Sequence, residues 1–333
     1  MNRKSLLSIL AVLAALLLLT GCGEKSVKQT PSADTETSAA PTEVATFPEA
    51  SADAAPVAEN QFAFTRSNFP RLDGSAFTVP FGQAVASVLL GESRDKVSDL
   101  INFSKTGRAY RALMNGDADV LLASEPAPAI WAEQDDGGYE WDMSPFAIDA
   151  LVFIVNAGNP VDSLTREQLR SVYAGEITNW AEVGGEDLEI VAFQRDEEAG
   201  SQTAMERLVM SGEPMADAPK ELVRGETGDL AEAVAVFEDS PAAIGYTMYY
   251  SAHNMGAADG LKILSVDGVA PDAETVRNGA YPFLTSYYVV TNAGRRADDP
   301  AKLLYDWILS ADGQRLVAHE GYAPIMDIGG DSP

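Results

Sequence analysis

Short apolar runs alternate with amphipathic segments along the chain from about Phe62 onward. The continuous apolar run at residues 151–155 predicts a strand that is buried on both faces, because such a strand has no polar side. Apolar residues spaced three and four positions apart, as at residues 303–308, predict helices that cover a sheet. Chains that alternate in this way fold as α/β proteins, so we expect a sheet flanked by helices.

The first 60 residues follow another pattern. Arg3 and Lys4 precede an apolar run at residues 6–19, which is short for a membrane span and fits a signal peptide. The run leads to Leu19-Thr20-Gly21-Cys22, which contains the only cysteine of the chain and resembles the lipobox of bacterial lipoproteins. In that family the signal is cleaved before the cysteine and lipid is attached to its thiol. An ordinary signal peptide with a chance cysteine is the alternative.

We therefore expect a lipoprotein signal peptide at residues 1–21 and lipidation at Cys22. Residues 22–60 are rich in Ala, Thr, Ser, Glu and Pro and hold few large apolar side chains. Such a segment buries too little apolar surface to offset its ordering entropy, so we expect a disordered tether. Through it, the lipid anchor would hold the folded body at the membrane.

Composition excludes several classes of function. The chain has 23 Lys and Arg against 50 Asp and Glu, a formal net charge of -27. Binding to nucleic acid needs a basic surface, so we expect no nucleic-acid partner. One cysteine allows no internal disulfide, and with only two histidines the usual zinc ligand set is absent. We expect neither a metal nor another cofactor.

Motifs of enzymes are also absent or incomplete. Ser93-Arg94-Asp95-Lys96 and Lys105-Thr106-Gly107 match two motifs of penicillin-binding enzymes, but they are only about ten residues apart, with no Ser-x-Asn element between them. There is no Gly-x-Ser-x-Gly elbow, no Walker loop and no His-Glu-x-x-His motif. We interpret the partial match as chance and expect no enzyme.

The most informative chemistry lies at residues 193–203. Arg195 follows a predicted strand, and Gly200-Ser201-Gln202-Thr203 opens a predicted helix. A helix N-terminus with two hydroxyls and an arginine can bind an oxyanion. Alternatively, Ser201 or Thr203 only caps the helix, and Arg195 pairs with the neighbouring acids. Two further hydroxyl-bearing loops, at residues 73–78 and 104–107, also precede predicted helices.

Together, several motifs resemble the phosphate-binding proteins of bacterial ABC importers, which have the type II periplasmic-binding-protein fold. The resemblance covers nearly all of residues 62–327. Its most specific parts are Gly175-Glu176-Ile177-Thr178-Asn179-Trp180 and the loop from Arg195 to Gly200-Ser201-Gln202-Thr203. The other matching motifs are Asp73-Gly74-Ser75, Asn102-Phe103-Ser104-Lys105-Thr106, Ala123-Ser124-Glu125-Pro126 and Ala243-Ile244-Gly245-Tyr246.

The resemblance implies two α/β lobes, joined by two crossover strands near Ala150 and Pro282, with the ligand in the cleft. Lobe I would comprise residues 61–149 and 283–327, and lobe II residues 150–282, with a tail at 328–333. The ligand-binding residues carried over from the family are Ser75, Phe77, Thr106 and Glu125 in lobe I and Arg195, Ser201, Gln202 and Thr203 in lobe II. Phe77 and Gln202 would contribute backbone N–H groups.

This sequence departs from the family at several of these positions. Ala76 stands where relatives commonly have Thr, Gln202 replaces Gly, and the loop from Arg195 to Ser201 is two residues longer. Glu125 takes the place of an Asp. An ionised carboxylate only accepts hydrogen bonds, so Glu125 would favour phosphate, which carries a proton, over sulfate, which carries none.

The function expected from this resemblance is that of a monomeric, lipid-anchored solute-binding protein on the extracytoplasmic face of the cell membrane. It would capture phosphate and deliver it to the permease subunits of an ABC importer. Two alternatives stay open. The ligand could be another oxyanion or a small organic anion, or the chain could be a sensor or partner-binding lipoprotein without a transport role.

Overall fold

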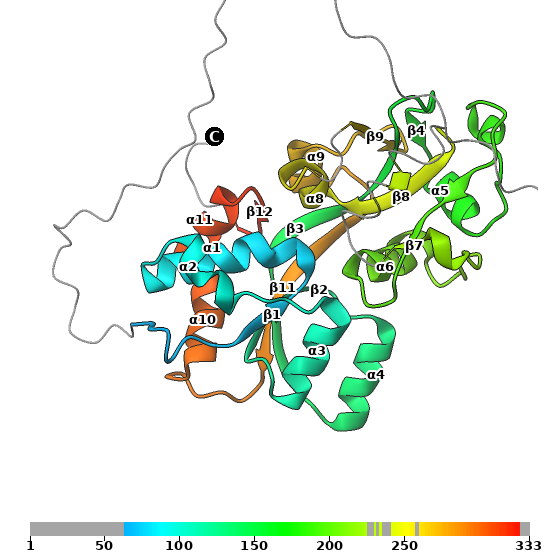
Figure 1. Cartoon of the computed structure of the whole chain (residues 1–333). Helices are drawn as coiled ribbons and strands as arrows, with labels where there is room; N and C mark the ends of the chain where they lie inside the picture. The colour runs from blue at the N-terminus through cyan, green and yellow to red at the C-terminus, as the bar shows by residue number, and fades with distance from the viewer. Residues whose placement is uncertain (1–62, 225–229, 231–232, 235–240, 257–259, 327–333) are drawn as a thin grey trace, which may run out of the picture. The chain divides into compact units, whose positions relative to one another are not determined.

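The longest strand, β3 (Trp141–Asn156), lies in the middle of an eight-stranded sheet and pairs with different strands along its two halves. Up to Ala150 it pairs antiparallel with β11 (Leu284–Asn292), and from Leu151 it pairs antiparallel with β8 (Ala243–Met248). Residues 150–155 are fully buried, as their apolar run predicts. The strand therefore links two groups of elements, which we call lobe I and lobe II (Figure 1). The computed structural model describes residues 63–224, 230, 233–234, 241–256 and 260–326.

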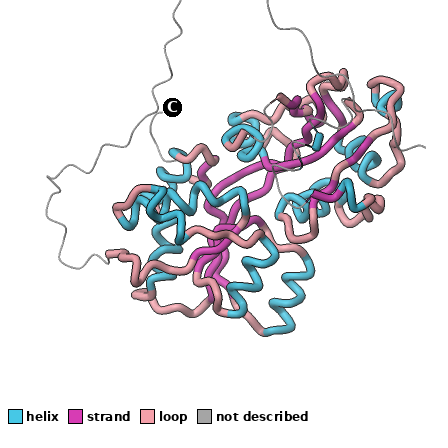
Figure 2. The backbone as a smooth tube through the Cα atoms, in the orientation of Figure 1, coloured by secondary structure: helices cyan, strands magenta, loops and turns pink. Residues whose placement is uncertain are grey.

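Lobe I is built on the sheet β1-β2-β11-β3, with β1 (Leu72–Gly74) parallel to β2 (Val120–Ser124) and β11 antiparallel to both of its neighbours. A short strand, β12 (Ala323–Pro324), also pairs with β3. Helices surround these strands (Figure 2). They are α1 (Val79–Leu90), α2 (Arg94–Val97), α3 (Thr106–Asn115), α4 (Pro128–Gly137), α10 (Pro300–Leu309) and α11 (Ala311–His319).

Lobe II is built on the second part of β3, which pairs with β8 and with β9 (Leu261–Ile263), while β5 (Val191–Ala192) pairs with β8. Two pairs of short strands accompany this sheet: β4 (Ser163–Leu164) with β10 (Ser265–Val266), and β6 (Gln194–Arg195) with β7 (Val223–Arg224). The described helices are α5 (Arg166–Tyr173), α6 (Gly200–Ala204), α8 (Tyr249–Asn254) and α9 (Ala273–Arg277). A π-helical stretch, Met205–Met210, continues α6.

These elements confirm the predicted α/β class. The lobe limits at 150 and 282 stay a prediction, with which the change of partner along β3 is compatible. The expected signal peptide (1–21), Cys22, the tether (22–60) and the tail (328–333) lie outside the described residues. Within the described ranges, no helix combines the length and apolar character that crossing a membrane requires.

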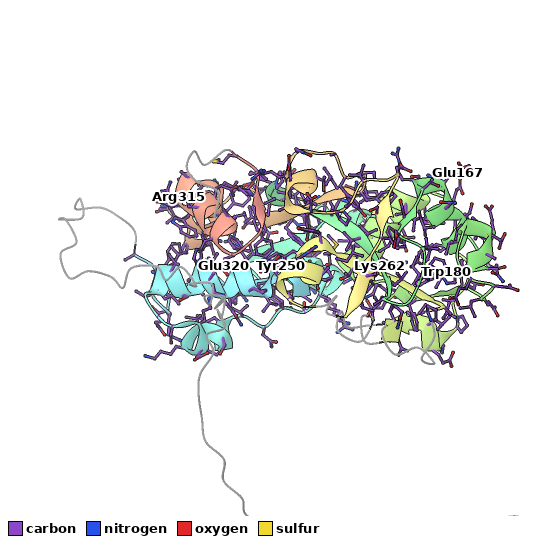
Figure 3. All side chains as sticks on the ribbon, turned by 90° about the horizontal axis from the view of Figure 1, so that it is seen from above. Glu167, Trp180, Tyr250, Lys262, Arg315 and Glu320 are labelled. Carbon is purple, nitrogen blue, oxygen red and sulfur yellow. The ribbon has the colours of Figure 1, made fainter. Side chains whose placement is uncertain are left out.

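The Gly-x-Ile-x-Asn-Trp motif has a structural role in lobe II. Asn179 caps the short helix Trp180–Val183, where its side chain accepts the N–H of Ala181 and Glu182 completes a capping box. Trp180, labelled in Figure 3, is buried, and its Nε1 donates to the carbonyl of Ala242 at 2.8 Å. The motif thus stabilises the core of this lobe.

A buried carboxyl lies where β3 changes partners. Asp149 accepts hydrogen bonds from Tyr287 Oη at 2.6 Å and from the N–H groups of Ala150 and Tyr250 at 2.7 and 3.1 Å. Burial raises the pKa of Asp149 from 3.8 to about 6, although these three hydrogen bonds oppose the shift. The unfolded chain releases this proton at lower pH. The native state therefore loses stability as the pH rises from about 4 to about 6.

Candidate anion-binding site

Three hydroxyls of lobe I meet at the carboxyl ends of β1 and β2. Ser75 follows β1, Ser124 ends β2, and Thr106 begins α3. Ser75 Oγ lies 2.8 Å from Thr106 Oγ1, accepts the N–H of Ser124 at 2.8 Å and donates to Ser124 Oγ at 3.3 Å. All three side chains are buried. The parallel pairing of β1 with β2 brings these loops together, as is typical of ligand sites in α/β proteins.

Lobe II meets this cluster at Gly200, the first residue of α6, which lies beside the end of β2 (Figure 1). A Cβ atom on Gly200 would lie 2.5 Å from Ser124 Oγ and 2.8 Å from Thr106 Oγ1. Only glycine allows this close approach of backbone to side chains. In the sequence, Ser124 and Gly200 belong to motifs of the family but are not predicted ligand-binding residues. The available signal was a hydroxyl directly after an apolar strand and a glycine that opens a helix.

Ser201 and Thr203 lie next to this contact. Ser201 is fully buried, and its Oγ has no hydrogen-bond partner among the described residues. Leaving a buried hydroxyl unpaired costs about 1–3 kcal/mol. Such a hydroxyl, on the residue after Gly200, is a donor that a bound anion could use. Thr203 is buried too and lines a cavity of about 390 Å³ together with Thr106.

Arg195 places a guanidinium in the interior of lobe II, where the residue is only 5% exposed. Its backbone N–H donates to Tyr246 Oη at 3.1 Å and to Gln202 Oε1 at 3.3 Å, and its Nε donates to the carbonyl of Arg224 at 3.1 Å. Tyr246 Oη also donates to Gln202 Oε1. The Gln202 side chain therefore fixes the end of β6 relative to α6 and supports Arg195.

One of the two predicted backbone donors is engaged elsewhere in the structure. The Gln202 N–H, expected to bind the anion, donates to the carbonyl of Ala199 at 2.9 Å, and the Thr203 N–H reaches the same oxygen at 3.2 Å. The tight first turn of α6 thus occupies this donor. Phe77 lies in the short helix Ala76–Thr78 with its ring buried, and its carbonyl accepts Tyr322 Oη at 2.7 Å.

The structure does not bring Glu125 into the hydroxyl cluster. Arg207 Nε of lobe II lies 3.0 Å from Glu125 Oε2, so the two form an ion pair. Glu125 lines a cavity of about 640 Å³ that Thr203 also lines, but it does not line the cavity of about 390 Å³ that Thr106 shares with Thr203. Glu is one methylene longer than the Asp of the family, which allows its carboxylate to reach across to Arg207.

The loop before Gly200 forms further contacts between the lobes. Lys105 Nζ lies 3.1 Å from Asp196 Oδ2, Arg111 Nη1 lies 2.8 Å from Glu198 Oε1, and the Gly107 N–H donates to the carbonyl of Glu198 at 3.3 Å. Hydrogen bonds with Glu133 and Glu198 raise the pKa of Arg111 above its ordinary value.

Lys105 has a strained backbone, with φ 84° and ψ 160°, a conformation that glycine alone adopts readily.

No group of His, Cys, Asp and Glu within the described ranges is suited to a metal ion. The structure therefore places hydroxyl groups at the contact between the lobes and one buried cationic side chain, that of Arg195, in the interior of lobe II.

Comparison with known proteins identifies the family. The family model of the PBP superfamily domain matches residues 80–312. The chain is 29% identical over 184 residues to the phosphate-binding protein PstS of Bacillus subtilis and 30% identical over 185 residues to that of Borreliella burgdorferi. These matches cover 55% and 54% of this chain, and 57% and 64% of those relatives.

A Clostridium perfringens protein solved with bound phosphate has the same fold, with a TM-score of 0.61 and 25% identity. The alignment covers 77% of this chain and 98% of that one. The type II periplasmic-binding-protein fold that the motifs predicted is thereby confirmed. The chain belongs to the PBP superfamily, a family of solute-binding proteins and not of enzymes.

Proposed function

We propose that this chain binds inorganic phosphate between its lobes and delivers it to an ABC importer. One observation carries the proposal. The buried hydroxyls of Ser124 and Thr106 in lobe I lie against Gly200 of lobe II, and the Oγ of the next residue, Ser201, lacks a partner among the described residues. The names of the Bacillus and Borreliella relatives and the phosphate in the Clostridium structure support phosphate as the ligand.

The proposed ligand set combines hydroxyls with one cation. Ser75, Thr106, Ser124, Ser201 and Thr203 supply hydroxyls, each of which can rotate to donate to an anionic oxygen. The Phe77 N–H adds a backbone donor, and Arg195 adds positive charge. Hydrogen bonds to charged groups contribute about 1.5–3 kcal/mol each, so a few of them suffice for tight binding. Glu125 would join this set only if it left Arg207, and the Gln202 N–H only if it left Ala199.

A small organic anion is the second candidate ligand. The cavity of about 640 Å³ touches Gln202 and Thr203, and it is far larger than phosphate requires. Its walls include Trp131 and Met215, which could contact the organic part of a larger ligand. A phosphate ester or phosphonate would place its anionic group at the hydroxyls and its remainder in this cavity.

The proposal includes an extracytoplasmic location. Cleavage after Gly21 and lipidation of Cys22 would leave the body tethered at the membrane through acyl chains, with no need for a spanning helix. The sequence supports this location through its apolar run at residues 6–19 and its single cysteine. A monomer that alternates between open and closed lobes would deliver the ligand to permease subunits.

Calorimetry and thermal shift on the purified protein test the ligand directly. Phosphate, sulfate, molybdate, tungstate and phosphonates should be compared, and a ligand at 100 times its Kd should add about 2.7 kcal/mol of stability. Arg195→Ala should reduce the shift. The matched control is Arg166→Ala, which removes an exposed arginine of lobe II that pairs with Asp267. If phosphate gives no shift while a phosphonate does, the organic ligand replaces phosphate as the conclusion.

A further inference from the structure

The cavity of about 640 Å³ is lined by residues of both lobes. Lobe I contributes Glu125, two prolines and Trp131 of α4, and lobe II contributes residues of α6, of the π-helical stretch that continues it, and of the loop at residues 212–218. Neither Arg195 nor Ser201 is among the lining residues. A group bound in this cavity would therefore be recognised by other side chains than those proposed to bind phosphate.

The walls of this cavity carry more negative than positive charge. Their charged side chains are one arginine, Arg207, and four acids: Glu125, Glu206, Glu213 and Asp217. Arg207 Nε lies 3.0 Å from Glu125 Oε2, so these two opposite charges offset each other. Glu213 Oε1 lies 3.9 Å from Arg170 Nη1, which is long for an ion pair. The remaining carboxylates repel an anion and attract a cation.

One of these carboxylates is held in position. Gln202 is buried, and its Nε2 donates to Glu206 Oε1 at 2.9 Å. An amide is neutral, so this hydrogen bond fixes the carboxylate of Glu206 without offsetting its charge. Glu206 therefore presents an oriented negative group to the cavity.

The lobe I wall adds an aromatic surface. Trp131 is 38% exposed, and its ring packs against the ring of Trp141 with 5.6 Å between the centroids. That contact holds the indole in place and leaves part of it open to the cavity, where Met215 adds further apolar surface. Aromatic faces attract organic cations, since the ring offers both negative potential and apolar contact. An exposed tryptophan opposite carboxylates is suited to a cation with carbon substituents.

We propose that this cavity binds an organic ammonium group, which Glu206 and Asp217 attract and the Trp131 ring contacts. Two sources share this chemistry. One is a free amine, and the other is the amine end of a phosphate monoester or phosphonate whose anionic end occupies the proposed phosphate site. Thr203, a proposed phosphate donor, also lines the cavity, which favours the second source. Only the second source rests on the proposed function.

Calorimetry on the full chain at about 0.15 M salt compares two matched pairs of ligands. Choline is compared with its neutral analogue, in which carbon replaces the nitrogen, and phosphocholine with its analogue of the same kind. Each pair keeps the shape of the ligand and removes only the positive charge. We expect the charged member of at least one pair to bind about two- to 30-fold more tightly, which is the worth of one cation–π contact.

Variants locate the preference, because a net charge of -27 attracts every cation weakly. Trp131→Leu removes the ring and keeps an apolar side chain, and Glu206→Gln removes the charge and keeps an oxygen that can accept from Gln202. Each should lower the preference for the charged ligand, and thermal unfolding shows that both are folded. The matched controls are Tyr139→Leu and Glu167→Gln, an exposed aromatic after α4 and an exposed acid on α5 (Figure 3), both outside the cavity. They should keep the wild-type preference.

The two pairs also separate the sources. A preference within the choline pair assigns the site to free amines, and one confined to the phosphocholine pair assigns it to the amine end of a phosphate compound. Equal affinity within both pairs, or a preference that Trp131→Leu and Glu206→Gln both leave unchanged, overturns the inference. Protein that binds phosphate without preferring an ammonium group loses only this inference, and protein that binds choline but not phosphate loses only the proposed function.

Discussion

Gly200 provides a direct test of the contact between the lobes. Replacement by Ala would place a methyl group 2.5 Å from Ser124 Oγ and 2.8 Å from Thr106 Oγ1, whereas ordinary contacts begin at 3.4 Å. The shortfalls are 3.4 − 2.5 = 0.9 Å and 3.4 − 2.8 = 0.6 Å, so the lobes must part by several tenths of an ångström. An anion bound between them would then lose contact with one side of the site.

The size of the effect follows from the cost of overpacking. Extra methyl groups in packed sites cost about 1–3 kcal/mol, which corresponds to a loss in phosphate affinity of about five- to 150-fold. Within lobe II the same change should not destabilise the chain, because Ala in a helix is favoured over Gly by up to about 1 kcal/mol. We therefore expect Gly200→Ala to weaken binding while the free energy of unfolding without ligand stays within about 1 kcal/mol of wild type.

The assay is phosphate calorimetry on a double-mutant cycle of Gly200→Ala with Ser124→Gly. Ser124→Gly removes both atoms that the new methyl group would meet at residue 124, and it keeps the N–H that donates to Ser75. If the steric reasoning holds, the double variant should bind about 1–2 kcal/mol more tightly than the sum of the single effects predicts. Phosphate affinity of Gly200→Ala within twofold of wild type, or strict additivity in the cycle, would refute it.

Four further predictions concern single positions. Lys105→Gly should be more stable to urea than Lys105→Ala by about 1 kcal/mol. The observed backbone angles cost a residue with a Cβ atom about 1–3 kcal/mol, and the greater chain entropy that Gly loses on folding offsets about 0.5–1 kcal/mol of this advantage. Equal stability would mean that residue 105 is unstrained. Asp149→Asn should remove the loss of stability that wild type undergoes as the pH rises from 4 to 7. The free energy of unfolding of the variant minus that of wild type should therefore increase by about 3 kcal/mol between these pH values, because the variant has no buried carboxyl with a pKa of about 6 to ionise. Parallel pH profiles of the two proteins would contradict this. Arg195→Ala should weaken phosphate and sulfate equally in calorimetry, since it removes charge without any preference for a proton, and a selective loss of one anion would argue against that role. Cys22→Ala should leave the chain unprocessed or released from the membrane fraction, and a signal-cleaved form that stays in that fraction would contradict the proposed anchor.

The sequence predicted the fold well where burial is a local property. The run at residues 151–155 is the buried second part of β3, and the helix expected at residues 303–308 is part of α10. What local patterns could not show is that β3 changes partners at Ala150 and Leu151, because the apolar run continues through that point. Buried strands are equally apolar in either sheet, so hydropathy carries no information on which neighbour a strand pairs with.

The hydroxyl cluster was predictable only in part. Ser75 and Thr106 carried a local signal, because each sits in a polar loop before a helix. Ser124 and Gly200 belong to different lobes and lie 76 positions apart in the sequence. Their role in the site comes from the contact between them, which depends on how the lobes are placed. No periodicity within either segment encodes that distance.

Glu125 shows a further limit. At the level of sequence, its carboxylate could turn toward the anion or toward an arginine, and the family pattern favoured the anion. In the structure it pairs with Arg207, which lies in the π-helical stretch that continues α6. A π-helix turns less per residue than an α-helix, so the 3.6-residue period used for sequence patterns does not say where Arg207 points. Glu198, in the loop before α6, lines a cavity together with Thr106 and binds Arg111 of lobe I.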